Sequence, residues 1–233
     1  MRFFQDVFAK QVNDRPMKDI AIYGAGGFGR EVACLIRIIN ERQREPEWNL
    51  VGFFDDNKEL KGKMISHYAP CLGGIDELNE YPEELYLTIP IGNSKTVYSI
   101  VQKITNSKVL YPNLIHPDVV FSDPQTFSIG KGNIIQRGCS FSCDVTLGDF
   151  NIANAAVALG HDVKLGSFNT VMPAVRVSGG VVIGDYNFFG VGSIILQYVK
   201  IGYDVRLGAG SVLITKPRDG KLYMGNPARK TEF

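Results

Sequence analysis

The sequence is poor in the residues that build metal centres and disulfide frameworks. It has three histidines and four cysteines among 233 residues. The cysteine spacing fits neither a zinc motif nor a dense set of disulfides, so we expect reduced thiols and no bound metal. The four cysteines are Cys34, Cys71, Cys139 and Cys143.

Charge bias and long apolar runs are missing as well. The formal net charge is +1, which gives no reason to expect a nucleic acid partner. No apolar run reaches the roughly 18 residues of a membrane span, so we expect no membrane insertion. The first ten residues carry Asp6 and Lys10 where a signal peptide needs apolar side chains. These absences predict a cytoplasmic protein.

What the sequence does contain is a periodic pattern between Ile129 and Leu213. Pairs of an aliphatic or aromatic residue and a glycine follow a six-residue beat, and the main pairs return on every third beat. They are Ile129-Gly130, Leu147-Gly148, Leu165-Gly166, Ile183-Gly184 and Ile201-Gly202. A hexapeptide repeat of this kind predicts a parallel β-helix, in which three short strands close one coil and stacked coils supply the core.

Two further columns of residues repeat in the same register. Valines stand two residues before the glycine pairs, and asparagines stand at 133, 151, 169 and 187. Because amides that repeat in register satisfy each other, the asparagines predict a side-chain ladder. The pattern places the β-helix between about residues 115 and 214, after the segment Leu114-Ile-His-Pro117. The tail after it is expected to fold back over the last coil without continuing the repeat.

The region before the repeat predicts a strand, a glycine-rich turn and a helix. A short apolar strand at 19–23 leads into Gly24, Gly26 and Gly29, and a helix is expected over 30–39. This G-x-G-x-x-G pattern in its expected context favours a phosphate held at a helix N-terminus. A close-packed turn without a ligand is the alternative.

Residues 1–17 form an extension in which Phe3, Phe4, Val7, Phe8 and Val12 fit one helix face that docks on the body or on another subunit.

Two more expected strands end in polar residues at the same edge of the sheet. The strand at 50–54 ends in Asp55-Asp56, and the strand at 84–91 ends in Gly92-Asn93-Ser94. Three strand ends that face one crevice describe a nucleotide site. The unit has only about 95 residues, half of a doubly wound sheet, which favours a mononucleotide or a nucleotide sugar over a dinucleotide.

One histidine interrupts the repeat and is the candidate for chemistry. His161 lies at an expected corner, where the equivalent residues in neighbouring coils are Cys143, Gly179 and Gln197. A histidine followed by Asp162 can act as a general base, since the carboxylate orients the ring and stabilises its cation. A surface histidine without a role is the alternative. The two other histidines, His67 and His116, lie at or before the first coil, so the three-histidine zinc site of a β-helix carbonic anhydrase is a poor fit.

These motifs together resemble one family. The hexapeptide beat, the opening IYGAGGFGREV, the junction LIHP, the segment GHDVKLG and the terminal GNPARK are similar to left-handed β-helix sugar acyltransferases of the PglD/NeuD type, over residues 18 to 230. The resemblance implies a Rossmann-like nucleotide-sugar-binding domain over 18–112, a left-handed β-helix over 113–215 and a C-terminal tail over 216–233. It also implies homotrimers with active sites between adjacent β-helices.

The resemblance further implies a reaction and the residues that carry it. Members transfer the acetyl group of acetyl-CoA to the amino group of a UDP-linked amino-deoxy sugar by direct transfer, with no covalent enzyme intermediate. By position, His161 matches the general base, with Asp162 and Asn154 beside it. The matching substrate-binding positions are Gly26, Gly27, Phe28, Asp55, Asp56 and Ser94, and the acetyl-CoA-binding positions are Thr170, Gly179, Val191 and Ala209. Thr170 stands where some relatives have a second histidine, and Phe28 replaces a residue that is often polar.

We therefore expect an acetyl-CoA-dependent N-acetyltransferase without a metal. Two alternatives stay open at this point. One is an O-acetyltransferase that acts on a sugar hydroxyl, of the sialic-acid type. The other is a non-catalytic protein that binds a nucleotide sugar.

Overall fold

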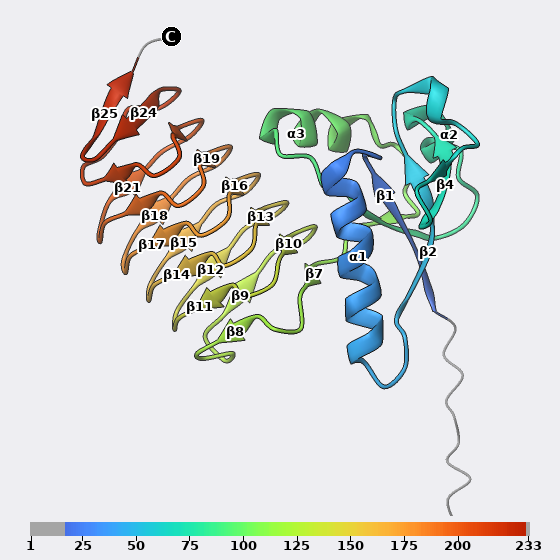
Figure 1. The fold of residues 1–233 in the computed structure, drawn as a ribbon, viewed down its shortest axis with the longest axis horizontal. Helices are drawn as coiled ribbons and strands as arrows, with labels where there is room; N and C mark the ends of the chain where they lie inside the picture. Colours follow the sequence, from blue (N-terminus) through green and yellow to red (C-terminus); the bar gives the residue numbers. More distant parts are fainter. Residues whose placement is uncertain (1–16, 232–233) are drawn as a thin grey trace, which may run out of the picture.

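The computed structural model describes residues 17–231, and the predicted docking of the extension falls on residues 1–16, outside this range. An α/β unit comes first in the chain and a β-helix follows it (Figure 1). The elements of the α/β unit are β1 (Lys18–Tyr23), α1 (Gly27–Arg42), β2 (Trp48–Phe54), the 3-10 helix η1 (Lys58–Leu60), β3 (Met64–Ile65), β4 (Ala69–Gly73), α2 (Ile75–Asn79), β5 (Leu85–Thr88), α3 (Ser94–Lys103) and β6 (Val109–Leu110).

The α/β unit is built on a sheet in the order β3-β4-β2-β1-β5-β6. Its strands pair in parallel except for β3, which is antiparallel to β4. The predicted strands at 19–23 and 50–54 are present, but the third is shorter than expected, from Leu85 to Thr88. Helix α1 starts three residues earlier than predicted, because the last residues of the glycine-rich turn form its first turn.

The β-helix has three parallel sheets that form the faces of a triangular prism. The first sheet contains β7 (Leu114–Ile115), β10 (Ile134–Ile135), β13 (Ile152–Ala153), β16 (Thr170–Val171), β19 (Phe188–Phe189) and β22 (Arg206–Leu207). The second contains β8 (Val120–Phe121), β11 (Ser140–Phe141), β14 (Ala158–Leu159), β17 (Arg176–Val177), β20 (Ile194–Ile195) and β23 (Val212–Leu213). The third contains β9 (Ser128–Ile129), β12 (Thr146–Leu147), β15 (Lys164–Leu165), β18 (Val182–Ile183) and β21 (Lys200–Ile201).

The predicted columns fill the prism. The valines at 145, 163, 181 and 199 and the aliphatic residues of the glycine pairs from 147 onward are buried in one continuous core. The asparagine ladder is confirmed: the amide nitrogens of Asn151, Asn169 and Asn187 each donate to the amide oxygen of the preceding asparagine in the column, at 3.0–3.1 Å. Coil-to-coil stacking of apolar and amide columns is therefore what holds the prism together.

Three corners join the sheets, and they need separate names. The first corner joins the first sheet to the second at residues 154–156. The second corner joins the second sheet to the third at residues 160–162. The third corner joins the third sheet to the first at residues 167–168. Each corner recurs in neighbouring coils at the same spacing as the strands, so each forms an edge of the prism.

The tail corrects one expectation. β24 (Leu222–Gly225) pairs in parallel with β22 and so extends the first sheet by one more strand. β25 (Ala228–Thr231) then returns antiparallel to β24 and closes that end. The register puts Leu222 opposite Arg206, which is a shorter step along the chain than the step from Phe188 to Arg206 in the preceding pair. The regular spacing of the repeat could not reveal this strand for that reason.

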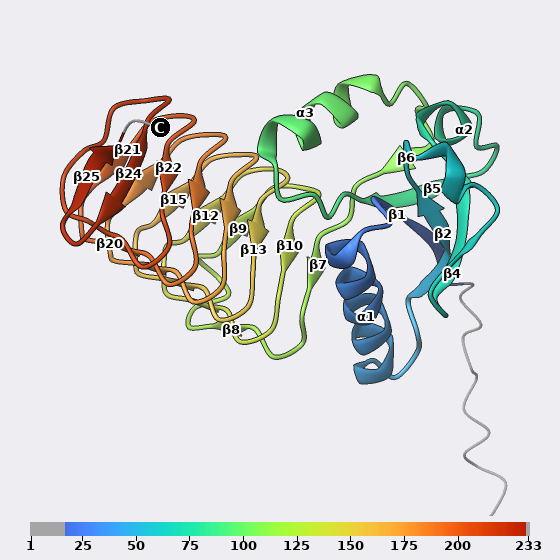
Figure 2. The ribbon, with the colours of Figure 1, turned by 45° about the horizontal axis from the view of Figure 1, so that its top comes forward.

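The α/β unit packs on the first sheet and on the third corner of the prism. Side chains of α1 share a core with Leu114, Ile134 and Ile152. Helix α3 lies along the third corner (Figure 2), where the Tyr98 ring meets the edges of Phe168 and Tyr186 at centroid distances of 5.5 and 5.7 Å. The second corner lies across the prism from this contact.

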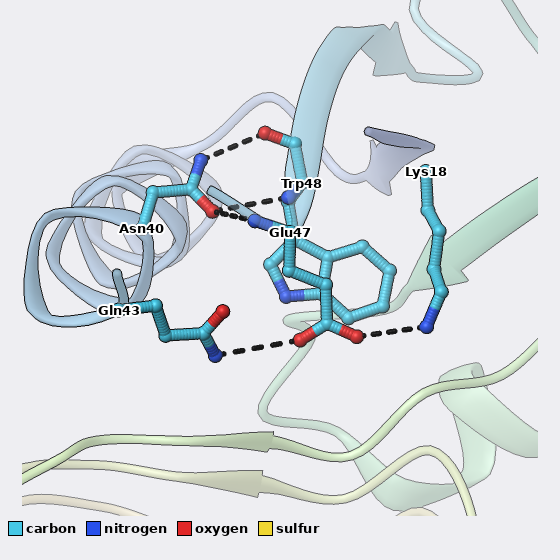
Figure 3. A network of polar contacts seen from close by, with 5 residues as sticks. All are labelled: Lys18, Asn40, Gln43, Glu47 and Trp48. Atoms are coloured by element: carbon cyan, nitrogen blue, oxygen red, sulfur yellow. Dashed lines mark hydrogen bonds and ion pairs between the residues drawn. The ribbon is translucent and has the colours of Figure 1, made fainter. Parts of the chain in front are cut away.

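A polar network fastens the last turn of α1 to the start of β2 (Figure 3). The side-chain amide of Asn40 donates to the carbonyl of Trp48 at 2.7 Å, and its oxygen accepts from the backbone N–H groups of Glu47 and Trp48. Glu47 also pairs with Lys18 at 2.9 Å.

Within residues 17–231, no helix combines the length and the apolar character needed to cross a bilayer.

Candidate active site

The order of the strands reverses around β1, and the crevice expected at such a point in an open α/β sheet lies at the carboxyl ends of its strands. β2 lies on one side of β1 and β5 on the other, so loops that leave the carboxyl ends of β1 and β5 diverge there. Among the described residues, apart from adjacent residues and the backbone of α1 itself, no atom lies within 4 Å of the position that a Cβ would take at Gly26 or Gly27. At Gly29 a Cβ would overlap the carbonyl oxygen of Gly24. Gly26 and Gly27 therefore leave space for a ligand, and Gly29 allows close packing of helix and turn.

The N-terminus of α1 faces this space and favours an anion. Its N-cap is Gly26, which has no side chain to accept from the first N–H groups, and the first turn holds no acidic residue. Those N–H groups have no intrahelical acceptor, and the helix dipole adds positive potential. A phosphate group is the ligand that such an arrangement suits best.

The two predicted carboxylates make contacts within the chain. The Asp55 carboxylate accepts from the backbone N–H of Ala25 at 2.8 Å and from that of Asn57 at 2.9 Å. The Asp56 carboxylate accepts from the Tyr23 hydroxyl at 2.5 Å. Burial, and then the nearby Asp56 carboxylate, raise the pKa of Tyr23. Asp55 thus shapes the glycine-rich turn itself, and a contact of either carboxylate with a ribose or base stays a prediction.

The loop after β5 joins the crevice to the β-helix. Ser94 is the first residue of α3, is 9% exposed, and lines a cavity of about 80 Å³. The cavity continues over Phe188 and Arg206 of the first sheet, with the Arg206 guanidinium 5.7 Å from the centre of the Phe188 ring. Sequence reasoning missed these two residues, although they follow Thr170 at the spacing of the repeat and so had a signal.

Thr170 lies with this loop and not with the other predicted acetyl-CoA residues. Its side chain is almost completely buried, and its hydroxyl donates to the carbonyl of Gly92 at 3.1 Å. Thr170 stands on the first sheet. Gly179 stands on the second corner, and Val191 and Ala209 stand on the first corner. The geometry of one chain therefore connects Thr170 to the loop after β5.

The second corner presents His161 as predicted. Nδ1 of His161 lies 2.7 Å from an Asp162 carboxylate oxygen, and the histidine side chain is 55% exposed. Asp162 takes the left-handed conformation, with φ of 59°, which aspartate tolerates better than most residues. With a hydrogen on Nδ1 donated to Asp162, Nε2 keeps a free lone pair. This is the arrangement that a general base requires.

Gly179 lies against the other side of the imidazole. A Cβ at Gly179 would overlap Nε2 of His161, so only glycine leaves room for the ring. Within the described part of the chain, the backbone N–H of Gly179 has no hydrogen-bond acceptor. A lone pair and a free donor thus lie side by side at this corner.

The remaining predicted residues lie on the first corner. Asn154 is there, with its side-chain oxygen accepting from the N–H of Ala155 at 2.8 Å, and Val191 and Ala209 occupy the same edge in later coils, both exposed. Strand β14 separates Asn154 from His161 in the chain. One chain does not bring the first and second corners together.

No cluster of metal ligands accompanies the site. Over residues 17–231, no group of three histidine, cysteine, aspartate or glutamate side chains stands close enough to hold an ion. His116 is nearly buried, and its Nδ1 accepts from the N–H of Asp118 at 3.0 Å, which is a structural role. His67 lies in the α/β unit with its ring 4.1 Å from that of Tyr68.

Comparisons with known proteins agree with this architecture. Residues 19–104 match the family model of the PglD N-terminal domain. No curated protein matches the chain by sequence. Among solved structures, the acetyltransferase domain of PglB from Neisseria gonorrhoeae FA1090 in complex with acetyl coenzyme A is 28% identical, with a TM-score of 0.81 over 93% of this chain and 100% of that one.

Two further solved structures give the same picture. PerB from Caulobacter crescentus, in complex with CoA and GDP-perosamine, is 26% identical with a TM-score of 0.80 over 93% of this chain and 99% of that one. WeeI from Acinetobacter baumannii AYE has the same identity and TM-score over 93% of this chain and all of its own. The predicted left-handed prism behind a Rossmann-like half domain is confirmed. The chain therefore carries a match to the PglD N-terminal domain over residues 19–104 and is similar, over 92% of its length, to a solved acetyltransferase domain.

Proposed function

We propose that this protein transfers the acetyl group of acetyl-CoA to the amino group of a nucleotide-linked amino-deoxy sugar, with UDP as the nucleotide. The observation that carries the proposal is the second corner, where Nε2 of His161 lies against Gly179 while Nδ1 is held by Asp162. Relatives that hold acetyl coenzyme A or GDP-perosamine support both substrate classes, and the base of the nucleotide is decided by the assay below.

The chemistry follows from the two groups on that corner. The sugar amine attacks the thioester carbonyl, and Nε2 of His161 takes the proton that the nitrogen loses. The oxyanion that develops on the acetyl oxygen accepts from the Gly179 N–H, which has no other acceptor in residues 17–231. When the carbon–sulfur bond breaks, the imidazolium gives its proton to the departing thiolate. The products are the N-acetyl sugar and free CoA thiol.

The site is completed by a second copy of the chain. The exposed His161 and the partly buried Gly179 stand on the second corner, and Asn154, Val191 and Ala209 stand on the first, so neither edge alone encloses an acyl group. A cyclic homotrimer sets the second corner of one copy against the first corner of the next and repeats this contact three times. The nucleotide crevice adjoins the first sheet, so the sugar held by one copy reaches His161 of its neighbour.

The test measures CoA thiol release with acetyl-CoA and a matched panel of UDP- and GDP-linked amino sugars and their hydroxyl counterparts. His161→Ala should lower kcat by about 10²–10⁴-fold, the usual contribution of a general base, without lowering the unfolding temperature. Cys143→Ala, at the equivalent position one coil earlier, is the control. Unaltered turnover in His161→Ala would remove the histidine from the mechanism. A preference for hydroxyl acceptors would instead assign O-acetylation.

A further inference from the structure

A groove of about 310 Å³ lies between α1 and the turn that leads into β4. Its walls are largely apolar and are formed by Ala33, Ile36, Trp48, Leu50 and Tyr68. Polar side chains stand around these walls: Arg37, Asn40, Glu41 and His67. The groove adjoins the C-terminal half of α1, whereas the nucleotide crevice lies at the N-terminus of that helix. It is therefore separate from the candidate active site.

The walls of the groove are held in place by specific contacts. The Asn40 network fixes the backbone of Trp48 against the last turn of α1 (Figure 3). On the opposite side, Ser66 takes the left-handed conformation with φ of 54°, a strained state for this residue that turns His67 and Tyr68 toward α1. The Tyr68 hydroxyl contacts the Cys34 sulfur at 3.1 Å. A groove with fixed walls offers a preformed surface to an occupant.

The N-terminal end of β1 lies directly beside this groove. Lys18 pairs with Trp48 across the β1–β2 ladder, and its N–H donates to the carbonyl of Glu47 at 2.8 Å. The Lys18 ammonium stands 5.4 Å from the centre of the Trp48 ring. The segment that precedes Met17 therefore starts from the end of the groove that Trp48 forms.

That segment carries the apolar side chains that such a groove accepts. Phe3, Phe4, Val7 and Phe8 lie within six positions of one another. The stretch of chain from Phe8 to Met17 spans up to about 30 Å when extended, so the reach is sufficient. A covalent tether of this length also gives the segment an effective concentration on the order of 1 mM at the groove, which favours the chain's own segment over one from another copy.

We propose that the groove between α1 and the 66–68 turn is the docking site of the chain's own N-terminal segment, with Phe4 and Phe8 as its anchors. Burial of two phenylalanine rings against Trp48 and Tyr68 supplies the driving force. The interaction is independent of the acetyl transfer proposed above, because it involves no residue of either corner or of the nucleotide crevice.

The first test places a photoreactive benzoylphenylalanine at position 8 of the full chain and identifies the cross-linked peptides by mass spectrometry. We expect links within one chain to the peptides that contain residues 33–50 or 66–68. The matched control carries the same group at Gln5, outside the apolar set, and should link several-fold less. Links to other surfaces, or no excess over the control, would overturn the proposal. A covalent dimer would assign the groove to the segment of a second copy and so overturn docking within one chain.

The second test uses Trp48, which is the only tryptophan in the sequence. In the double variant Phe4→Ser/Phe8→Ser, the emission of Trp48 should shift to longer wavelength because water enters the groove. Gln5→Ser should leave the spectrum unchanged. Both proteins should keep the acetyl-transfer rate and the far-ultraviolet dichroism of the parent, which shows that they fold. An unshifted spectrum in a folded double variant would count against docking.

Discussion

Gly179 shows how one missing Cβ can position the ring of the proposed general base, His161. A methyl group there would overlap Nε2 of His161 and stand 2.6 Å from its Cε1, closer than packed atoms come. The half-exposed ring can swing away, so Gly179→Ala should fold normally. The displaced base should then lower kcat by about 10²-fold. Steady-state kinetics beside a thermal melt separate the two effects, and Ser178→Ala serves as the control. Full activity in a folded Gly179→Ala would show that the ring position does not matter.

Single residues were predictable where they interrupted the repeat and unpredictable where their partners lie far away in the chain. His161 stood out because its equivalents in other coils are not histidines, and its neighbour Asp162 does hold the ring. Thr170 finds its partner, Gly92, in a distant loop of the α/β unit, and Asp55 reaches back from the end of β2 to Ala25. Such contacts depend on how distant segments pack, and no local pattern records them.

At the scale of elements, the N-terminus of α1 can be tested with a substitution that stabilises the helix and blocks the crevice. Asp is a preferred N-cap residue, and the N-cap here is Gly26, with φ of −72° and open space around it. Gly26→Asp should therefore keep or raise the unfolding temperature. Its carboxylate would occupy the proposed phosphate position and repel the phosphate group. KM for the nucleotide sugar should therefore rise by about tenfold or more, since a tenfold rise needs a loss of only about 1.4 kcal/mol of binding free energy. KM for acetyl-CoA should not change.

Gly26→Ala is the matched control for charge. It fills little of the space and adds no negative group, so its KM for the sugar should stay near that of the parent. If Gly26→Asp binds the nucleotide sugar as well as the parent does, the phosphate does not lie at this helix end.

The asparagine ladder is the second element whose contribution can be measured. Asn169 is fully buried, and its side-chain oxygen accepts from both the backbone and the amide nitrogen of Asn187. Asn169→Ala leaves the backbone N–H of Asn187 without an acceptor and leaves its amide nitrogen with the Gly202 carbonyl alone, which should cost about 2–4 kcal/mol of unfolding free energy. Urea denaturation gives this value. Asn49→Ala, at an exposed position in β2, is the control. If both variants lose the same unfolding free energy, the ladder does not stabilise the prism.

The elements of the prism were predictable because their spacing repeats, but the reason for the glycines was not. A Cβ at Gly148 would lie 2.8 Å from the carbonyl oxygen of Gly166 in the next coil, so close stacking requires glycine there. Left-handed conformations occur at other corner residues, such as Phe150 and Ala174. Helix α3 and the tail strand β24 have no periodic signal of this kind and were not predicted.

At the scale of the whole molecule, the packing of the α/β unit on the prism decides which edges stay free. Phe150, Phe168 and Tyr186 stack along the third corner and receive Tyr98 from α3. The regular spacing of these three rings was readable in the sequence, but their partner was not. The first and second corners remain uncovered by this contact and carry the predicted catalytic residues and, apart from Thr170, the predicted acetyl-CoA residues. We expect the two corners to meet in the proposed trimer.

Mixed assemblies of two impaired variants test this arrangement directly, assayed with the nucleotide sugar far below KM. His161→Ala disables the second corner, and Gly26→Asp weakens the nucleotide crevice beside the first sheet. If each site takes one part from each of two copies, an equal mixture formed by co-expression should regain about a quarter of the parent activity. Half of the copies supply an intact second corner and the other half an intact crevice, so about one site in four receives both. A mixture of His161→Ala with Gly179→Ala should regain none, since both defects lie on the same corner of one chain. If each site is contained within a single chain, neither mixture should recover activity. Equal recovery in both mixtures would contradict the proposed geometry, because His161 and Gly179 would then be supplied by different copies.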